Sequence, residues 1–98
     1  MEKLNMLRKK VSADAATEFK FESPCCVFLV KNMTKGDVFL SFGGAPKSTD
    51  DMLMLPAGSW QRHVCHTVSG NLASCTSVFV KGSGEAADGS VEVECLKW

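Results

Sequence analysis

Apolar and polar side chains alternate along much of this chain. In residues 38–42 (VFLSF) every second position, beginning with Val38, is a candidate for a buried face, and residues 17–23 (TEFKFES) place two phenylalanines between charged side chains. Residues 76–82 (TSVFVKG) and 90–98 (SVEVECLKW) repeat the pattern. A period of two is typical of a β-strand with one buried face. The pattern therefore predicts half-buried strands in all four segments.

Turn-forming residues divide the apolar runs. Residues 31–37 (KNMTKGD) contain the Asn, Gly and Asp that turns favour, so the sequence predicts a hairpin between strands at 28–32 and 38–42. Residues 52–68 predict a strand carrying Leu53 and Leu55, a turn from Pro56 to Gly58, and a second strand to about Thr67. An early strand is expected at residues 4–11, and residues 12–19 offer at most one helical turn.

The expected fold class is all-β. About eight short strands, separated by turn signals roughly every 8 to 12 residues, predict an antiparallel β-sandwich or a small jelly-roll-like barrel, and the sequence leaves the choice between them open. The length predicts a single β domain over residues 1–98. Residues 43–51 and 82–89 are rich in Gly, Ser and Asp and are expected to be surface loops, where binding residues often lie.

Charge argues against two classes of partner. The chain has 11 basic and 11 acidic residues and a formal net charge of zero, so we expect neither a nucleic-acid nor a membrane partner. Arg8 to Lys10 is too short for a basic patch and is expected to be a solvated strand edge. No apolar run approaches the roughly 20 residues of a membrane span, and the N-terminus lacks the apolar stretch of a signal peptide. We therefore expect the chain to begin at Met1 and to lie in the cytosol.

The cysteines and histidines do not form a recognisable metal motif. Five cysteines is an odd number and Cys25 and Cys26 are adjacent, so free thiols are expected. Zinc-ligand spacings such as C-x2-C are absent, and in a strand His63 and Cys65 would share a face while His66 points to the other. Cys95 continues the inward register of its strand. We expect no metal ion and no cofactor.

Catalytic motifs are also missing. A Cys–His pair can be proposed only because both residue types are present. The glycine-rich segments 41–46 and 82–89 match no phosphate-binding loop. The acidic pairs Asp50–Asp51 and Glu92–Glu94 fit a solvated face better than a cation site. We expect no catalytic residues and no enzymatic activity.

Aromatic side chains supply the candidate interaction surface. If the alternate positions of their strands face the core, Phe39 and Phe79 project outward, and outward aromatics are typical of binding or subunit surfaces. Trp60 and Trp98 would extend this surface. The alternative is that both sheet faces are covered within one chain. Residues 51–55 (DMLML) are expected to fill the core instead.

The order and spacing of several segments carry a family resemblance. They are an N-terminal strand, TEFKF, FLVKN, GDVFLSFG, LPAGSWQ, VFVKGSG and VEVECL. This succession, which spans nearly the whole chain, resembles small β-sandwich proteins of the virion-structure region of tailed bacteriophages and prophages. The five cysteines and the HVCH strand (residues 63–66) depart from that family and leave room for a local site.

The resemblance implies a non-enzymatic virion structural or accessory protein, present in many copies on a capsid, tail or fibre. We expect a homo-oligomer, for example a trimer, that docks on a capsid or tail protein, is made in the bacterial host cytoplasm and is located in the virion. The alternative is a small β-sandwich module that binds host carbohydrate or peptide, with aromatics lining a groove near residues 43–51.

Overall fold

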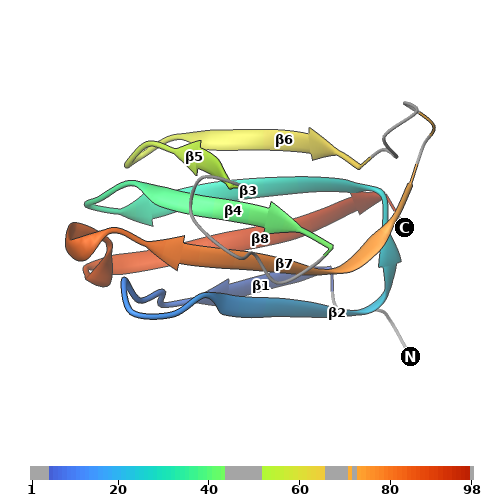
Figure 1. The fold of residues 1–98 in the computed structure, drawn as a ribbon. Helices are drawn as coiled ribbons and strands as arrows, with labels where there is room; N and C mark the ends of the chain where they lie inside the picture. Colours follow the sequence, from blue (N-terminus) through green and yellow to red (C-terminus); the bar gives the residue numbers. More distant parts are fainter. Residues whose placement is uncertain (1–4, 44–51, 66–70, 72, 98) are drawn as a thin grey trace.

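The computed structural model describes residues 5–43, 52–65, 71 and 73–97, which form two four-stranded antiparallel sheets packed face to face (Figure 1). The first sheet contains, in spatial order, β1 (Met6–Lys9), β8 (Gly89–Lys97), β3 (Val27–Thr34) and β6 (Trp60–Val64). The second sheet contains β2 (Thr17–Cys25), β7 (Cys75–Gly82), β4 (Val38–Phe42) and β5 (Leu53–Leu55). A short 3-10 helix, η2 (Gly84–Ala87), lies between β7 and β8.

The strand order is that of an eight-stranded jelly roll. Each connection, except the one from β4 to β5, carries the chain from one sheet to the other, which is how two interlocked Greek keys are wound. The all-β prediction is confirmed. Of the two predicted alternatives, the structure is the β-sandwich, because its strands form two separate packed sheets. In the described part of the chain, no helix is long and apolar enough to cross a membrane.

The predicted hairpin between residues 28–32 and 38–42 is wrong in its pairing, and the two strands predicted on either side of the Pro56–Gly58 turn are not paired with each other either. β3 and β4 lie in different sheets, as do β5 and β6, although the turns fall where the sequence placed them. In a hairpin the two strands would be hydrogen-bonded neighbours. Here their apolar faces meet across the core, with Phe28 and Val30 on one sheet and Val38 and Leu40 on the other, all of them buried. The period-two pattern shows which face is buried but does not specify which strand lies alongside.

The edges of the sheets explain two further details. β1 is an edge strand, and Arg8, Lys9 and Lys10 are exposed on it or directly after it, as expected. β2 is also an edge strand and continues through Pro24 to Cys25, with a register irregularity between Lys20 and Cys25. Proline, which lacks an N–H, is tolerated on an edge because, among the described strands, β2 has a neighbour on one side only, so one side needs no hydrogen-bond donor.

The core lies between the sheets and takes its side chains from alternate strand positions. These inward residues pack as one continuous cluster. Its members are Val11, Phe19, Phe21, Cys25, Phe28, Val30, Val38, Leu40, Leu55, Cys65, Val78, Val80, Ala86, Val91, Val93 and Cys95.

A buried polar side chain, Asn32, holds the turns at one end of the sandwich. Its Nδ2 donates to the carbonyl oxygens of Gly36 and Leu55, each at 2.9 Å, while its Oδ1 accepts from the Thr34 N–H at 3.0 Å and the Thr34 hydroxyl at 2.7 Å. The Asn32 backbone also bonds to Ser59 and Gly58. One amide therefore joins the β3–β4 turn to β5 of the other sheet, and buried polar groups satisfied in this way fix a single arrangement of the chain.

Candidate functional site

The clearest concentration of exposed apolar side chains lies along one lateral edge of the sandwich. β5 and β6 are the end strands of the two sheets and lie on the same side of the molecule (Figure 1). Leu53 and Met54 on β5 are 49% and 56% exposed, and Trp60 on β6 is 67% exposed. Val64, at the far end of β6, is 39% exposed. We call these four residues the β5–β6 edge.

This edge also leaves backbone groups without a strand partner. Among the described strands, β5 pairs with β4 on one side and β6 pairs with β3 on one side. The outer N–H and C=O groups of an edge strand can accept a further strand. Both strands are short, three and five residues, which limits such pairing to a small patch.

The predicted surface of four aromatics is divided between the two sheets. Phe39 and Phe79 lie on the outer face of the second sheet, as expected, where Phe79 is opposite Ser41, two positions from Phe39. Both rings are half-buried, and Met54 lies opposite Phe39 on β5. These three residues form one apolar strip that reaches the β5–β6 edge.

Trp60 lies on β6 and therefore belongs to the first sheet, whereas Phe39, Phe79 and Met54 belong to the second. It pairs with Lys31 of β3, whose neighbours Val30 and Asn32 are buried, so Trp60 belongs to the outer face of the first sheet. It therefore does not extend the face that carries Phe39 and Phe79. Trp98 lies outside the described residues.

Trp60 also ends a cross-strand row of charged side chains. Arg8, Glu92, Lys31 and Trp60 occupy consecutive strands of the first sheet at the same level. Glu92 accepts from Arg8 at 3.2 Å and forms an ion pair with Lys31 at 3.7 Å. Glu92 thus has a basic partner on each side and its side chain is only 13% exposed, so this carboxylate is ion-paired rather than solvated as the sequence predicted. Asp50 and Asp51 lie outside the described residues.

The exposure of Leu53 and Met54 contradicts the prediction made from the sequence. Residues 51–55 were expected to fill the core, but Leu55 alone among the leucines of β5 is buried, at 4% exposure, while Leu53 and Met54 are exposed. The reason is that β5 is short and last in its sheet, so the sandwich closes over one of its side chains only. All three residues of β5 are apolar and each was a candidate for the core, so the sequence did not indicate that Leu53 and Met54 are exposed.

All five cysteines lie at the end of the sandwich opposite the Asn32 turns, and two of them are joined. Cys25 of β2 and Cys95 of β8 form a disulfide that links the two sheets. The expectation of free thiols is therefore wrong for this pair and holds for Cys26, Cys65 and Cys75. Adjacency of Cys25 and Cys26 was a poor guide because neighbours in an extended chain point in opposite directions, so that one of them can bond across the core.

Of the remaining thiols, Cys26 and Cys65 are buried and Cys75 is partly exposed. Cys65 Sγ lies 3.8 Å from Cys75 Sγ. Burial raises the pKa of Cys65 to about 12, with Cys75 and Cys26 adding to the rise, and burial also raises the pKa of Cys75. A thiol must lose its proton to act as a nucleophile or metal ligand, so Cys65 and Cys75 are poorly activated at neutral pH.

The geometry of His63 fits packing better than metal binding. His63 on β6 and Cys65, which directly follows β6, share a face as predicted, and the structure places that face inward. The His63 ring stacks on Phe42 with centroids 3.8 Å apart and an interplanar angle of 8°. Within the described ranges, no three His, Cys, Asp or Glu side chains gather as a metal site would require. His66 lies outside those ranges.

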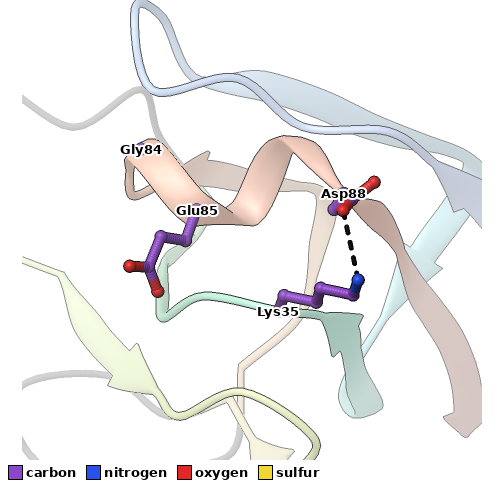
Figure 2. A pocket seen from close by; sticks show the side chains of 4 residues that line it. All are labelled: Lys35, Gly84, Glu85 and Asp88. Carbon is purple, nitrogen blue, oxygen red and sulfur yellow. Dashed lines mark ion pairs between the residues drawn. The ribbon is translucent and has the colours of Figure 1, made fainter.

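A shallow pocket of about 420 Å³ opens beside η2, at the Asn32 end. Figure 2 shows Lys35, Gly84, Glu85 and Asp88 around it, with Lys35 reaching toward Asp88 at 3.4 Å. Both partners of this ion pair are largely exposed. None of the described residues that line the pocket carries an aromatic ring on which a sugar could stack.

Comparison with known proteins assigns neither a family nor a function to this chain. No protein-family model, no curated protein and no solved structure matches the chain.

Proposed function

We propose that this protein is a non-enzymatic assembly subunit, in which copies contact one another through the β5–β6 edge. The observation that carries the proposal is the exposure of Leu53, Met54 and Trp60 along two strands that, within the described part of the chain, each have a neighbouring strand on one side only. Single exposed apolar residues are ordinary, but several large ones on the two end strands at one side of the sandwich favour a contact surface. Tryptophan is also enriched among the residues that contribute most to binding at protein interfaces.

The physical character of the edge favours a second copy of the chain as the occupant. β5 and β6 contain no carboxylate, and Arg62 supplies a single positive charge, so nothing in these strands strongly repels an apolar partner. The net charge of zero removes long-range repulsion between copies. Apolar contact with limited backbone pairing is the means by which such copies would assemble.

The biological setting we propose is the virion of a tailed bacteriophage or prophage. The protein would be a capsid decoration, head–tail or fibre component, self-associated as a ring such as a trimer and docked on a capsid or tail protein. The resemblance given above supports this setting, and the jelly-roll topology, which recurs in viral capsid domains, supports it by analogy of fold alone.

The Cys25–Cys95 disulfide is compatible with that setting. Disulfides are rare in the reducing cytosol and persist on secreted proteins and virion surfaces. A protein made in the host cytoplasm and carried outside the cell in a virion would pass from one condition to the other.

The test compares solution mass by light scattering over a range of concentrations for wild-type protein, Trp60→Lys and the control Leu96→Lys. Leu96 is 44% exposed and lies on β8, away from the edge strands. We expect the wild type and Leu96→Lys to form the same oligomer and Trp60→Lys to be monomeric with an unchanged circular dichroism spectrum. A wild type that stays monomeric throughout would overturn the proposal.

A second measurement separates assembly from the binding-module alternative. In a Trp98→Phe background, Trp60 is the single tryptophan, so its fluorescence reports on the edge. Assembly predicts a change with protein concentration. A change on adding soluble sugar or peptide, at constant mass, would favour the module instead.

A further inference from the structure

The jelly roll brings three thiols and one disulfide to the same end of the sandwich. β2 ends at Cys25 with Cys26 following, Cys65 directly follows β6, and β7 begins at Cys75. The pairing of strands sets these positions, because Cys75 is the register partner of Cys25 and the Cys65 N–H donates to the Cys26 carbonyl at 2.9 Å.

Two of the thiols are placed for bond formation. The Sγ atoms of Cys65 and Cys75 are 3.8 Å apart, and the Ala73 N–H donates to the Cys65 carbonyl at 3.1 Å, so the backbone near both cysteines is held together. A disulfide requires the sulfurs to approach to about 2.05 Å, and rotation about the Cα–Cβ bonds moves them without separating the strands. Cys65 is 6% exposed and Cys75 is intermediate.

We propose that Cys65 and Cys75 form a second disulfide when the protein meets a small-molecule disulfide such as oxidised glutathione. This bond would join β6 of the first sheet to β7 of the second, as Cys25–Cys95 joins β8 to β2. It would fix β6, the strand that carries Trp60, to the opposite sheet. The inference stands independently of the proposed assembly.

The reaction proceeds in two exchange steps. At alkaline pH, where more of the thiol is ionised, the thiolate of Cys75, the more accessible of the two, attacks one sulfur of oxidised glutathione, forming a mixed disulfide and releasing one glutathione thiolate. The thiolate of Cys65 then attacks the Cys75 sulfur and releases the second glutathione. The two protons lost by the cysteines are taken up by the departing thiolates. The protein is oxidised by two electrons, and one glutathione disulfide is reduced to two thiols.

Cys26 and the existing disulfide provide competing pairings. Cys26 lies near Cys65, and Cys75 lies beside Cys25 in the ladder, so exchange could instead yield Cys26–Cys65 or Cys25–Cys75. Sulfur proximity favours Cys65–Cys75, because the 3.8 Å separation is already close. These competitors are distinguishable by peptide mapping.

The sequence makes that mapping direct. Cleavage after Lys and Arg places Cys65 and Cys75 in one peptide, residues 63–81, Cys25 and Cys26 in residues 21–31, and Cys95 in residues 82–97. The protein is treated with oxidised glutathione, quenched with N-ethylmaleimide, digested without reduction and measured by mass spectrometry. We expect peptide 63–81 to be unalkylated and lighter by two hydrogens, while peptide 21–31 carries one alkyl group and stays joined to peptide 82–97.

Variants supply the controls. Cys26→Ser should give the same product in peptide 63–81 at an unchanged rate, whereas Cys75→Ser should leave Cys65 as a thiol or as a glutathione adduct. The proposal is overturned if wild-type peptide 63–81 carries two alkyl groups, retains a stable glutathione adduct, or becomes linked to peptide 21–31. The wild-type map decides this even where a variant folds poorly.

Discussion

At the end of the sandwich that holds the β3–β4 and β5–β6 turns, the contacts are made by backbone carbonyls and the side chain of Asn32. At the opposite end they are made by sulfur atoms and by a row of rings in which Phe28 lies between Phe21 and Phe42, and Phe42 stacks on His63. The first end has few ways to change without breaking hydrogen bonds. The second contains groups whose bonding depends on the redox conditions. The two ends of one jelly roll are thus held by different chemistry, amide and carbonyl hydrogen bonds at one and thiols, a disulfide and stacked rings at the other.

The largest effect on this comparison is expected from the existing disulfide. Replacing Cys25 and Cys95 together by Ala removes a cross-link with a sequence separation of 70, and loop-closure entropy predicts a loss of about 4 kcal/mol in the free energy of unfolding. Urea unfolding, compared with a Cys26→Ala control, measures it. If the two proteins unfold at the same urea concentration, the cross-link does not stabilise this end.

The next effect is at the Asn32 end. Asn32→Ala leaves the Leu55 carbonyl and the Thr34 N–H without the amide that bonds to them, while the Gly36 carbonyl keeps its bond from the Thr34 hydroxyl. Buried groups left unsatisfied should lower the free energy of unfolding by about 3 kcal/mol. The exposed Asn5→Ala change is the control and should have little effect. A small effect of Asn32→Ala in thermal or urea unfolding would mean that water replaces the amide.

A smaller effect is expected where η2 meets the β3–β4 turn. A Cβ added at Gly36 would lie 2.6 Å from Ser83 Oγ and 2.7 Å from the Ala86 backbone N, whereas a Cβ at Gly84 meets nothing within 4 Å. Gly36→Ala should therefore cost about 2 kcal/mol, and Gly84→Ala close to zero. Equal unfolding midpoints for the two variants would show that η2 moves away freely.

The smallest effect is a dependence of stability on pH at the cysteine end. Because burial raises the pKa of Cys65 to about 12 from an ordinary value of 9.0, and raises that of Cys75, folding favours the protonated thiols. Their contribution is fully present below about pH 9 and is lost as the pH rises through the folded values. Under anaerobic conditions, the free energy of unfolding should fall more steeply above pH 9 for wild type than for Cys65→Ser/Cys75→Ser. Parallel pH curves would contradict this.

The candidate site was predictable only in part. The outward positions of Phe39 and Phe79 followed from the alternation in their strands, since burial of one face places the intervening residues on the other. The exposure of Leu53 and Met54 did not follow, because it depends on β5 being last in its sheet. Trp60 lies on a different outer face from Phe39 and Phe79, and this likewise depends on which sheet contains β6.

The sequence by itself determined the strand class, most strand positions and which side chains turn inward, because these depend on a local period of two and on turn residues. Only the tertiary structure decided which strands are neighbours, that Cys25 meets Cys95 across 70 positions, and which strands remain at the edge. The physical reason is that pairing and cross-links between distant segments are chosen by the closure of two sheets around one core. Each strand alone is compatible with several neighbouring strands, and the alternation of apolar and polar residues does not specify which of them it pairs with.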